Sequence, residues 1–285
     1  MRFDRSSVPF LLILLFISVF YGCSKSSGTY SVIEPAPTPP LPDVSSMIKR
    51  ITTQDSCRDF TATMRLTALD KDNKKDQIEF SMQRKYSADR TATFLSVLAP
   101  HEETDKALLA IEEPDKSTQA FSYLPGLRKL NKLNSEKQLG FHGAKVTVQE
   151  LLGMELNQYT KSAGERVTKG EEPVIKVEFK EKPYLGLGFP RIVGYFREKD
   201  GQPLEFELYD VRNELQKEVA IEEVKTIQNR QTITKIAIDD LSQKLKLRLD
   251  VLKIDYDRGL PDSLFTEKHL ISFISNAGRL LDQLK

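Results

Sequence analysis

The feature that most constrains the fold is a repeated alternation of apolar and polar residues. Between Phe60 and Ala68 every second residue is apolar, and the residues between them are threonine or arginine. A period of two residues places alternate side chains on opposite faces of a strand, so this segment is expected to bury one face. Ile78 to Tyr86 also alternates, with Ile78, Phe80, Met82, Arg84 and Tyr86 on one face, and the polar turn at 70–73 predicts that the two strands form a hairpin.

Shorter segments of the same character follow and are expected to be strands: 93–98, 107–112, 119–124, 155–159, 174–180, 192–197, 204–209, 221–226, 232–238 and 244–254. Helices are expected at 43–51, at 265–284 in part, and after Thr147, where a capping box with Glu150 opens a short helix through Leu152. Many sequential strands with few helices predict a mainly β (α+β) domain, built on a single antiparallel sheet that curls on itself. Alternation alone leaves a two-sheet sandwich open.

The beginning of the chain resembles that of a bacterial lipoprotein. Arg2 and Arg5 precede an apolar run from Val8 to Phe20, and Gly22 then precedes Cys23. This order is typical of a secretory signal that ends at a lipid-modified cysteine, and the run is shorter than the ~20 residues that a membrane-spanning helix needs. Residues 1–22 are therefore expected to be a signal peptide and Cys23 the acylated first residue. The alternative is an ordinary cleaved signal followed by an unmodified cysteine.

Residues 23–46 are expected to form a tether and residues 47–285 the folded domain. The tether begins with serine, lysine and glycine and continues with closely spaced prolines, a composition typical of an extended spacer. The chain has 42 basic and 41 acidic residues, and removal of the signal takes away Arg2, Arg5 and Asp4, which leaves a formally neutral mature chain. Neither its charge nor a basic stripe favours nucleic acid as a partner. The expected location is the cell envelope, lipid-anchored at the outer membrane and facing the periplasm.

The sequence contains no recognisable catalytic or metal-binding pattern. Its histidines, His101, His142 and His269, have no second ligand at metal-binding spacing. The chain also lacks a nucleophile elbow, a phosphate-binding loop and a dinucleotide-binding glycine pattern. We therefore predict a protein that is not an enzyme and has no cofactor or metal.

Apolar side chains on successive strands are the remaining candidates for a functional site. They would line either a filled core or a cavity for acyl chains, which a curled sheet of this size can enclose. The candidate lining residues are Met64, Leu66, Phe80, Met82, Phe121, Tyr123, Phe206 and Leu208.

Several segments resemble the LolA-like outer-membrane lipoprotein-sorting family. Phe121 to Leu133 contains a Tyr-Leu-Pro segment followed by basic residues that alternate with aliphatic ones. Phe141 to Lys145 and Thr147 to Leu151 resemble the family's Phe-x-Gly segment and the acidic stretch after it. Ile254 to Thr266 resembles its closing Leu-Pro-Asp and Phe-Thr segment. Lys145 stands where the family has an acid, so no role of that acid is carried over.

The resemblance implies an incomplete antiparallel barrel, with short helices over its open side and an apolar cavity that shields acyl chains in the periplasm. The helices at 43–51 and 147–152 are candidate lids, and Arg128 and Lys129 are candidates for contact with a head group at the rim. The implied partners are lipid or lipoprotein acyl chains, the bacterial membrane through Cys23, and an envelope export system. An anchored chain favours a membrane-bound acceptor over a diffusing shuttle. The competing interpretation is a structural or protein-interaction lipoprotein with a filled core.

Overall fold

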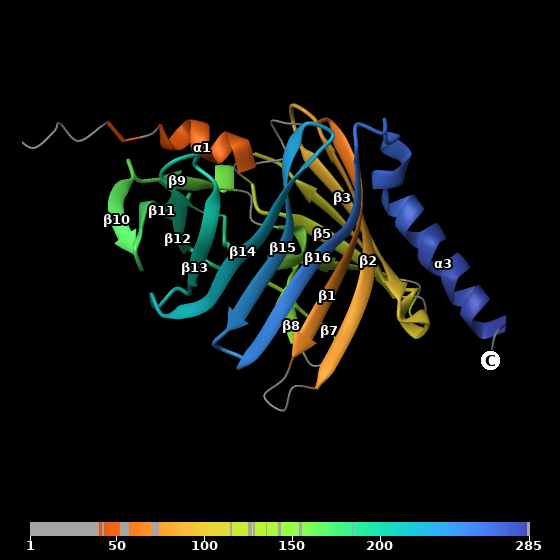
Figure 1. Cartoon of the computed structure of the whole chain (residues 1–285). Coiled ribbons are helices and arrows are strands. Elements are labelled where there is room, and N and C mark those ends of the chain that lie inside the picture. Colours follow the sequence, from red (N-terminus) through yellow and green to blue (C-terminus); the bar gives the residue numbers. More distant parts are fainter. Residues whose placement is uncertain are drawn as a thin grey trace, which may run out of the picture. The chain divides into compact units, whose positions relative to one another are not determined.

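The computed structural model describes residues 40–283 except 42, 52–56, 70–73, 115, 125, 126, 128, 135, 142, 143, 154, 155 and 184 (Figure 1). The strands are β1 (Asp59–Leu69), β2 (Lys75–Tyr86), β3 (Thr91–Ala99), β4 (Ala107–Glu112), β5 (Gln119–Leu124), β6 (Lys129–Leu133), β7 (Gln138–Phe141), β8 (Ala144–Thr147), β9 (Tyr159–Lys161), β10 (Glu165–Lys169), β11 (Glu172–Glu181), β12 (Arg191–Arg197), β13 (Pro203–Tyr209), β14 (Leu215–Ile227), β15 (Arg230–Asp240) and β16 (Leu245–Tyr256). The α-helices are α1 (Val44–Ile51), α2 (Val148–Leu152) and α3 (Glu267–Gln283).

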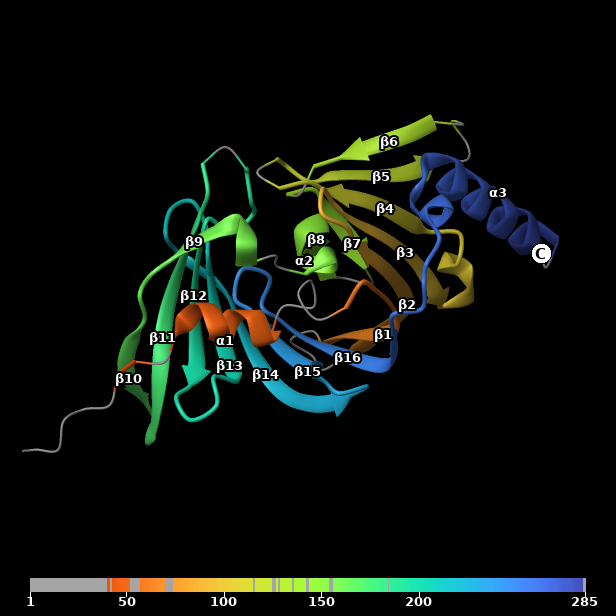
Figure 2. The ribbon, with the colours of Figure 1, turned by 90° about the horizontal axis from the view of Figure 1, so that it is seen from above.

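A single 14-stranded sheet organises this domain, in the order β10-β11-β12-β13-β14-β15-β16-β1-β2-β3-β4-β5-β6, with β9 beside β11. Each strand runs antiparallel to its neighbours, and β1 pairs with β16, so distant parts of the chain meet in the middle of the sheet. The sheet curls strongly but β6 and β10 remain edge strands (Figure 2). The predicted mainly β fold, an incomplete antiparallel barrel, is thereby confirmed.

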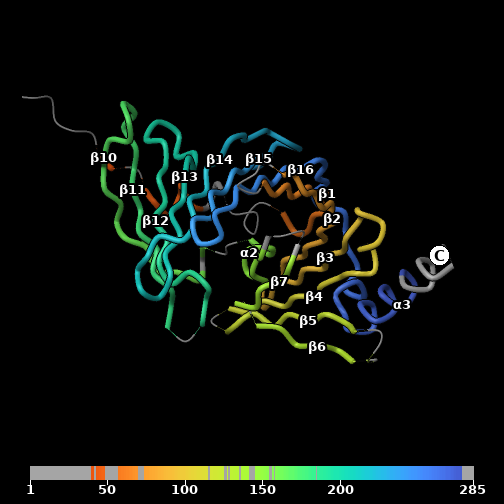
Figure 3. The backbone as a smooth tube through the Cα atoms, turned by 90° about the horizontal axis from the view of Figure 1, so that it is seen from below, coloured from red at the N-terminus to blue at the C-terminus, as the bar shows by residue number. Residues whose placement is uncertain are grey.

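The largest apolar cluster lies on the concave face of β1–β4. Leu66 pairs with Ile78 and Met64 pairs with Phe80, so the alternation recognised in both strands places these side chains on the same face. The β7–β8 hairpin and α2 lie inside the curve of the sheet (Figures 2 and 3) and add Val148 to the same cluster. The concave face is therefore covered by a segment of the chain between β6 and β9.

A second cluster occupies the other half of the sheet, on β11 to β14. Its rings are in contact, with centroids 6.5 Å apart for Phe179 and Phe196 and 5.8 Å for Phe196 and Phe206. Helix α1 contributes Val44 and Met47 to this cluster. The predicted helix at 43–51 is confirmed, and it is capped by Asp43, whose carboxylate accepts hydrogen bonds from the backbone of residues 45 and 46.

A third cluster lies under α3, against β3, β4 and β5 (Figure 1). Leu270 and Ile274 of α3 are buried there, and Phe94 contacts His269 with ring centroids 4.8 Å apart. The residues of β4 alternate between this cluster, which contains Leu109, and the concave one, which contains Leu108. Both faces of this part of the sheet are therefore covered, which explains why its strands are apolar throughout.

The closing segment recognised in the sequence has a structural role. The buried Asp59 carboxylate accepts hydrogen bonds from the backbone N–H groups of Arg258, Gly259 and Leu260, at 2.7, 3.1 and 3.2 Å. Gly259 has φ = +70°, a left-handed conformation that glycine adopts without strain. This turn connects β16 to α3 and fixes the start of the helix on β1.

One predicted strand is wrong and several short strands were not predicted. In place of a strand at 155–159 the chain forms a 3₁₀ turn, Leu156–Gln158, before β9 begins at Tyr159. The turn buries Leu156 and brings the Tyr159 hydroxyl to the Phe189 carbonyl, 3.0 Å away. β6 and β10 are short edge strands with several lysines, β7 and β8 form a four-residue hairpin, and neither kind of segment carries a strong alternation.

Candidate functional site

An apolar pocket of about 360 Å³ opens beside β3–β6, lined mainly by residues of the concave cluster and also by Tyr123 and Ile274 of the cluster under α3. Its volume lies within the ~300–1,000 Å³ that is usual for small-molecule sites. Leu95, Leu108 and Leu133 come from the sheet, and Leu139 and Leu151 come from β7 and α2. The complete lining is Leu95, Val97, Asp105, Lys106, Ala107, Leu108, Ser122, Tyr123, Leu124, Leu133, Leu139, Gly140, Leu151 and Ile274.

Helix α2 forms one wall of this pocket, and buried polar contacts hold it in place. The predicted capping box is present: the Thr147 side chain accepts from the Glu150 backbone, while the Glu150 carboxylate accepts from the Thr147 backbone. Gln149 accepts a hydrogen bond from the backbone of Gly188 at 2.8 Å and donates one to the Tyr159 hydroxyl at 3.3 Å. Burial raises the pKa of Tyr159, so its hydroxyl remains neutral. These contacts tie α2 to the loop between β11 and β12.

A buried ionic cluster ties the start of α2 to the floor formed by β14 and β15. The Lys217 ammonium lies 2.5 Å from the Glu150 carboxylate and 2.7 Å from the Asp240 carboxylate. Asp240 is fully buried. Burial acts to lower the pKa of Lys217, but the two carboxylates outweigh it and raise that pKa. Burial acts to raise the pKa of Asp240, but hydrogen bonds from Lys217 and Ser242 lower it. Lys217 and Asp240 are therefore both charged at neutral pH.

The other end of α2 is held by Arg84 of β2. Its guanidinium donates to the Leu152 carbonyl, the last residue of the helix, and lies 2.5 Å from the Glu112 carboxylate. Arg84 is 4% exposed and Glu112 is 6% exposed. A buried ion pair is costly to break, because either partner alone would leave an uncompensated charge. Helix α2 is thus connected to three walls of the incomplete barrel.

The structure distributes the predicted lining residues among the three clusters. Met64, Leu66, Phe80 and Met82 lie in or against the concave cluster, Phe206 and Leu208 lie in the second cluster, and Phe121 and Tyr123 lie under α3. Among them, Tyr123 lines the apolar pocket. The candidate head-group residue Lys129 is exposed on the edge strand β6, whereas Cys23 and Arg128 lie outside the described residues.

Sequence reasoning missed most of the pocket's lining. The segments at 93–98 and 107–112 were recognised as strands, but both of their faces are apolar, so the pattern could not show which residues point inward. Leu139 and Leu151 come from the insert, which is the β7–β8 hairpin with α2. The position of this insert on the concave face depends on the polar contacts of α2 with Gly188, Lys217 and Arg84. Among the described residues, no helix is long and apolar enough to cross a membrane and no acidic, histidine or cysteine cluster could hold a metal.

Comparison with known proteins supports the fold. A protein-family model described as "Uncharacterized protein"-like matches residues 89–272, more than half of the chain. A search of curated proteins gave no match.

Solved structures with the same fold cover most of the chain. An outer membrane lipoprotein-sorting protein domain from Vibrio parahaemolyticus is 17% identical with a TM-score of 0.68, and the match covers 80% of this chain and 96% of that one. A DUF1329 family protein from Desulfovibrio piger is 16% identical with a TM-score of 0.68, covering 79% and 96%. A LolA superfamily protein from Nitrosomonas europaea is 16% identical with a TM-score of 0.67, covering 80% and 99%. The resemblance recognised in the sequence is confirmed at the level of the fold.

Proposed function

The chain belongs to the family whose model matches residues 89–272, and from that premise we propose that it is a lipid-anchored envelope protein that binds acyl chains. Cys23 is the anchor, and the domain faces the periplasm from the outer membrane. The protein takes part in sorting or transfer of lipoproteins or lipids, and it acts by binding, without covalent chemistry. An envelope export system supplies its cargo.

The observation that carries the proposal is the apolar pocket of about 360 Å³ on the concave face. Burial of an acyl chain away from water contributes about 0.8 kcal/mol per methylene group, so a pocket lined by leucines can compete with a bilayer for the chain. The fold shared with a lipoprotein-sorting domain and a LolA superfamily protein supports the same cargo class.

Helix α2 is the part of the site that would have to move for a longer chain to enter. Its apolar face contributes Leu151 to the pocket, while Val148 and Leu152 pack deeper in the concave cluster. Displacement of α2 would extend the pocket toward Phe80 and Met82, two of the residues predicted to line it. The predicted lid at 147–152 therefore remains part of the proposal.

Gly140 allows a direct test of the pocket. Gly140 lies in the pocket's lining, and a Cβ at this position would have no atom within 4 Å, so a larger side chain there narrows the entrance without pressing on the core. We expect the mature chain with Cys23→Ser, purified from a bacterial periplasm, to carry lipid detectable by native mass spectrometry and extraction. Gly140→Leu should remove that lipid, whereas the matched Gly140→Ala should retain it. Equal urea midpoints for both variants would exclude unfolding as the cause.

A structural or protein-interaction lipoprotein is the second candidate function. The observation that favours it is the insertion of α2 and the β7–β8 hairpin, which fill much of the concave face. A clean apo mass for the wild type, unchanged after incubation with lipids, would contradict acyl-chain binding and support this candidate.

A further inference from the structure

The neighbouring strands β4 and β5 separate at the end that lies beside the apolar pocket. Their pairing stops at Leu109 and Phe121, although β4 begins at Ala107 and β5 continues to Leu124. On either side the pairing continues through this stretch, β3 with β4 and β5 with β6. The separation is therefore confined to the space between β4 and β5.

Residues from both faces of the sheet line the pocket at this gap. Continued past its last pair, the register places Leu108 opposite Ser122, and Ala107 opposite Tyr123. Leu108 belongs to the concave cluster, whereas Ala107 and Tyr123 belong to the cluster under α3. All four residues line the pocket, together with Ile274 of α3. Each facing pair contains one small residue, so the pocket can pass between the strands and end against α3.

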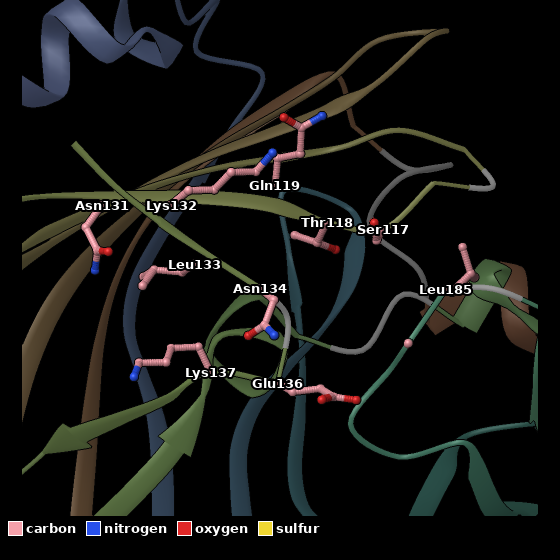
Figure 4. A pocket seen from close by; sticks show the side chains of 11 residues that line it. Ser117, Thr118, Gln119, Asn131, Lys132, Leu133, Asn134, Glu136, Lys137 and Leu185 are labelled. Atoms are coloured by element: carbon pink, nitrogen blue, oxygen red, sulfur yellow. The ribbon is translucent and has the colours of Figure 1, made fainter.

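A neighbouring groove of about 700 Å³ offers no comparable path for an apolar chain (Figure 4). It shares Leu133 with the pocket. Apart from Leu133, Leu185 and Gly186 its lining is polar, and it includes the exposed side chains of Asn134 and Lys137. Burial of such groups against methylene groups is unfavourable, because they would lose hydrogen bonds to water. The apolar continuation of the pocket is therefore the one between β4 and β5.

Helix α3, which covers the outer side of the gap, is held by polar contacts at its start and by apolar contacts along its length. The turn before the helix is fixed by the hydrogen bonds of Asp59 and Lys85. Beyond this turn, the described part of α3 contacts the sheet through apolar and aromatic side chains, among them Leu270, Phe273 and Ile274. Apolar contacts are non-directional, so an acyl chain can replace them. The helix can therefore move away from the sheet about a fixed start.

We propose that a bound acyl chain enters beside Gly140, passes between β4 and β5, and ends under α3, which moves outward to receive it. The inference rests on the proposed function and deepens it, because it assigns the site of the terminal methyl group and selects long acyl chains as the cargo. Phe121 and Tyr123, which were predicted to line the site, lie on this face of the sheet. Displacement of α2 enlarges the pocket on the concave side, and displacement of α3 enlarges it at the opposite end.

Chain length and the size of residue 107 test the path through the gap. The mature chain with Cys23→Ser should bind palmitate more tightly than laurate, by up to about fourfold for each further methylene group that is buried. Ala107→Leu narrows the gap and should remove most of this gain, while laurate binding remains. The matched Ala107→Ser, which keeps the residue small, should retain the gain. Urea unfolding of both variants shows whether the fold is intact, and a gain that survives Ala107→Leu would overturn the proposal.

Photoaffinity labelling of the unaltered pocket gives an independent test. Two palmitate analogues, with a diazirine either at the terminal carbon or beside the carboxyl group, are irradiated with the mature chain carrying Cys23→Ser, and the labelled peptides are identified by mass spectrometry. We expect the terminal diazirine to label α3 and the other to label the β7–β8 hairpin near Gly140. Labelling by the terminal diazirine that spares α3 would overturn the proposal and leave acyl-chain binding in place. Failure of both analogues to bind would instead contradict the proposed function.

Discussion

The two halves of the curled sheet complete their interiors in different ways. The half formed by β11 to β14 is filled by the sheet's own side chains, among them Phe179, Phe196 and Phe206. The half formed by β1 to β6 is filled by an insert, α2 with the β7–β8 hairpin, and leaves an apolar pocket beside it. The same fold thus contains a close-packed region and a region whose packing depends on a separate segment.

The close packing of the first half is visible at Gly194. A Cβ there would lie 2.8 Å from Phe196, closer than real Cβ contacts come, and 3.0 Å from Phe206, which is also tight. In the other half the insert is held through polar groups, Glu150 with Lys217 and Arg84 with the Leu152 carbonyl. Polar contacts hold the insert at a few points of specific geometry, whereas interlocked rings fill the other half throughout and cannot be moved without opening a void. The difference indicates that the half formed by β1 to β6, and not the half formed by β11 to β14, can exchange part of its interior for a ligand.

The largest effect is expected from Phe196→Ala in the close-packed half. Truncation leaves a cavity among rings that cannot collapse, so the free energy of unfolding should fall by about 3–5 kcal/mol. Urea unfolding measures this loss. Lipid occupancy of the folded protein should be unchanged, because Phe196 does not line the apolar pocket. Loss of lipid from a fully folded variant would contradict the separation of the two halves.

Arg84→Met should lower the free energy of unfolding by about 3 kcal/mol, because it leaves Glu112 buried without its ion-pair partner. The double variant Arg84→Met/Glu112→Leu should recover much of this stability, because it removes both charges. Hydrogen exchange should increase in α2 in both variants, since each lacks the donor to Leu152. Protection of α2 equal to that of the wild type would show that the hairpin alone holds the helix.

A smaller loss, about 1–3 kcal/mol, is expected from Gly194→Ala, which forces a methyl group against two rings. Gly140→Ala is the matched comparison, because its Cβ meets no atom within 4 Å, and it should cost less than 1 kcal/mol. Thermal or urea unfolding of the pair measures the contrast. Equal losses would show that the two halves are packed alike.

The smallest effect on stability is expected from a change of pH that protonates Asp240, which lies beneath the insert on β15. The pKa of Asp240 is lower in the folded protein than its usual 3.8, so its contribution to stability is present above that pH and is lost as the pH falls through the folded value. Stability measured by urea unfolding should therefore decline below pH 3.8. The isosteric Asp240→Asn should be less stable at neutral pH and show a flatter decline. A parallel decline in both would assign the acid sensitivity to other groups.

Much of the fold could be predicted from the residues. The alternation from Phe60 to Ala68 and the capping box at Thr147 are local patterns, and local geometry is enough to specify them. The 3₁₀ turn at Leu156–Gln158 could not be predicted, since it depends on a hydrogen bond between Tyr159 and Phe189 thirty residues away. The partition of the candidate lining residues among three clusters was equally beyond a local pattern, because it depends on which face of each strand is covered by which segment.

By itself the sequence determined a mainly β domain, the buried face of each of the first two strands, and the cap of α2, because hydrophobic periodicity and capping act over a few residues. Only the tertiary structure decided that the insert enters the concave face and that α3 covers the opposite face of β3–β5. The position of the apolar pocket follows from these choices. The physical reason is that an apolar strand face shows that it will be buried but not which segment will cover it. Long-range polar contacts, such as Arg84 with the Leu152 carbonyl and Lys217 with Glu150, determine which segment lies there.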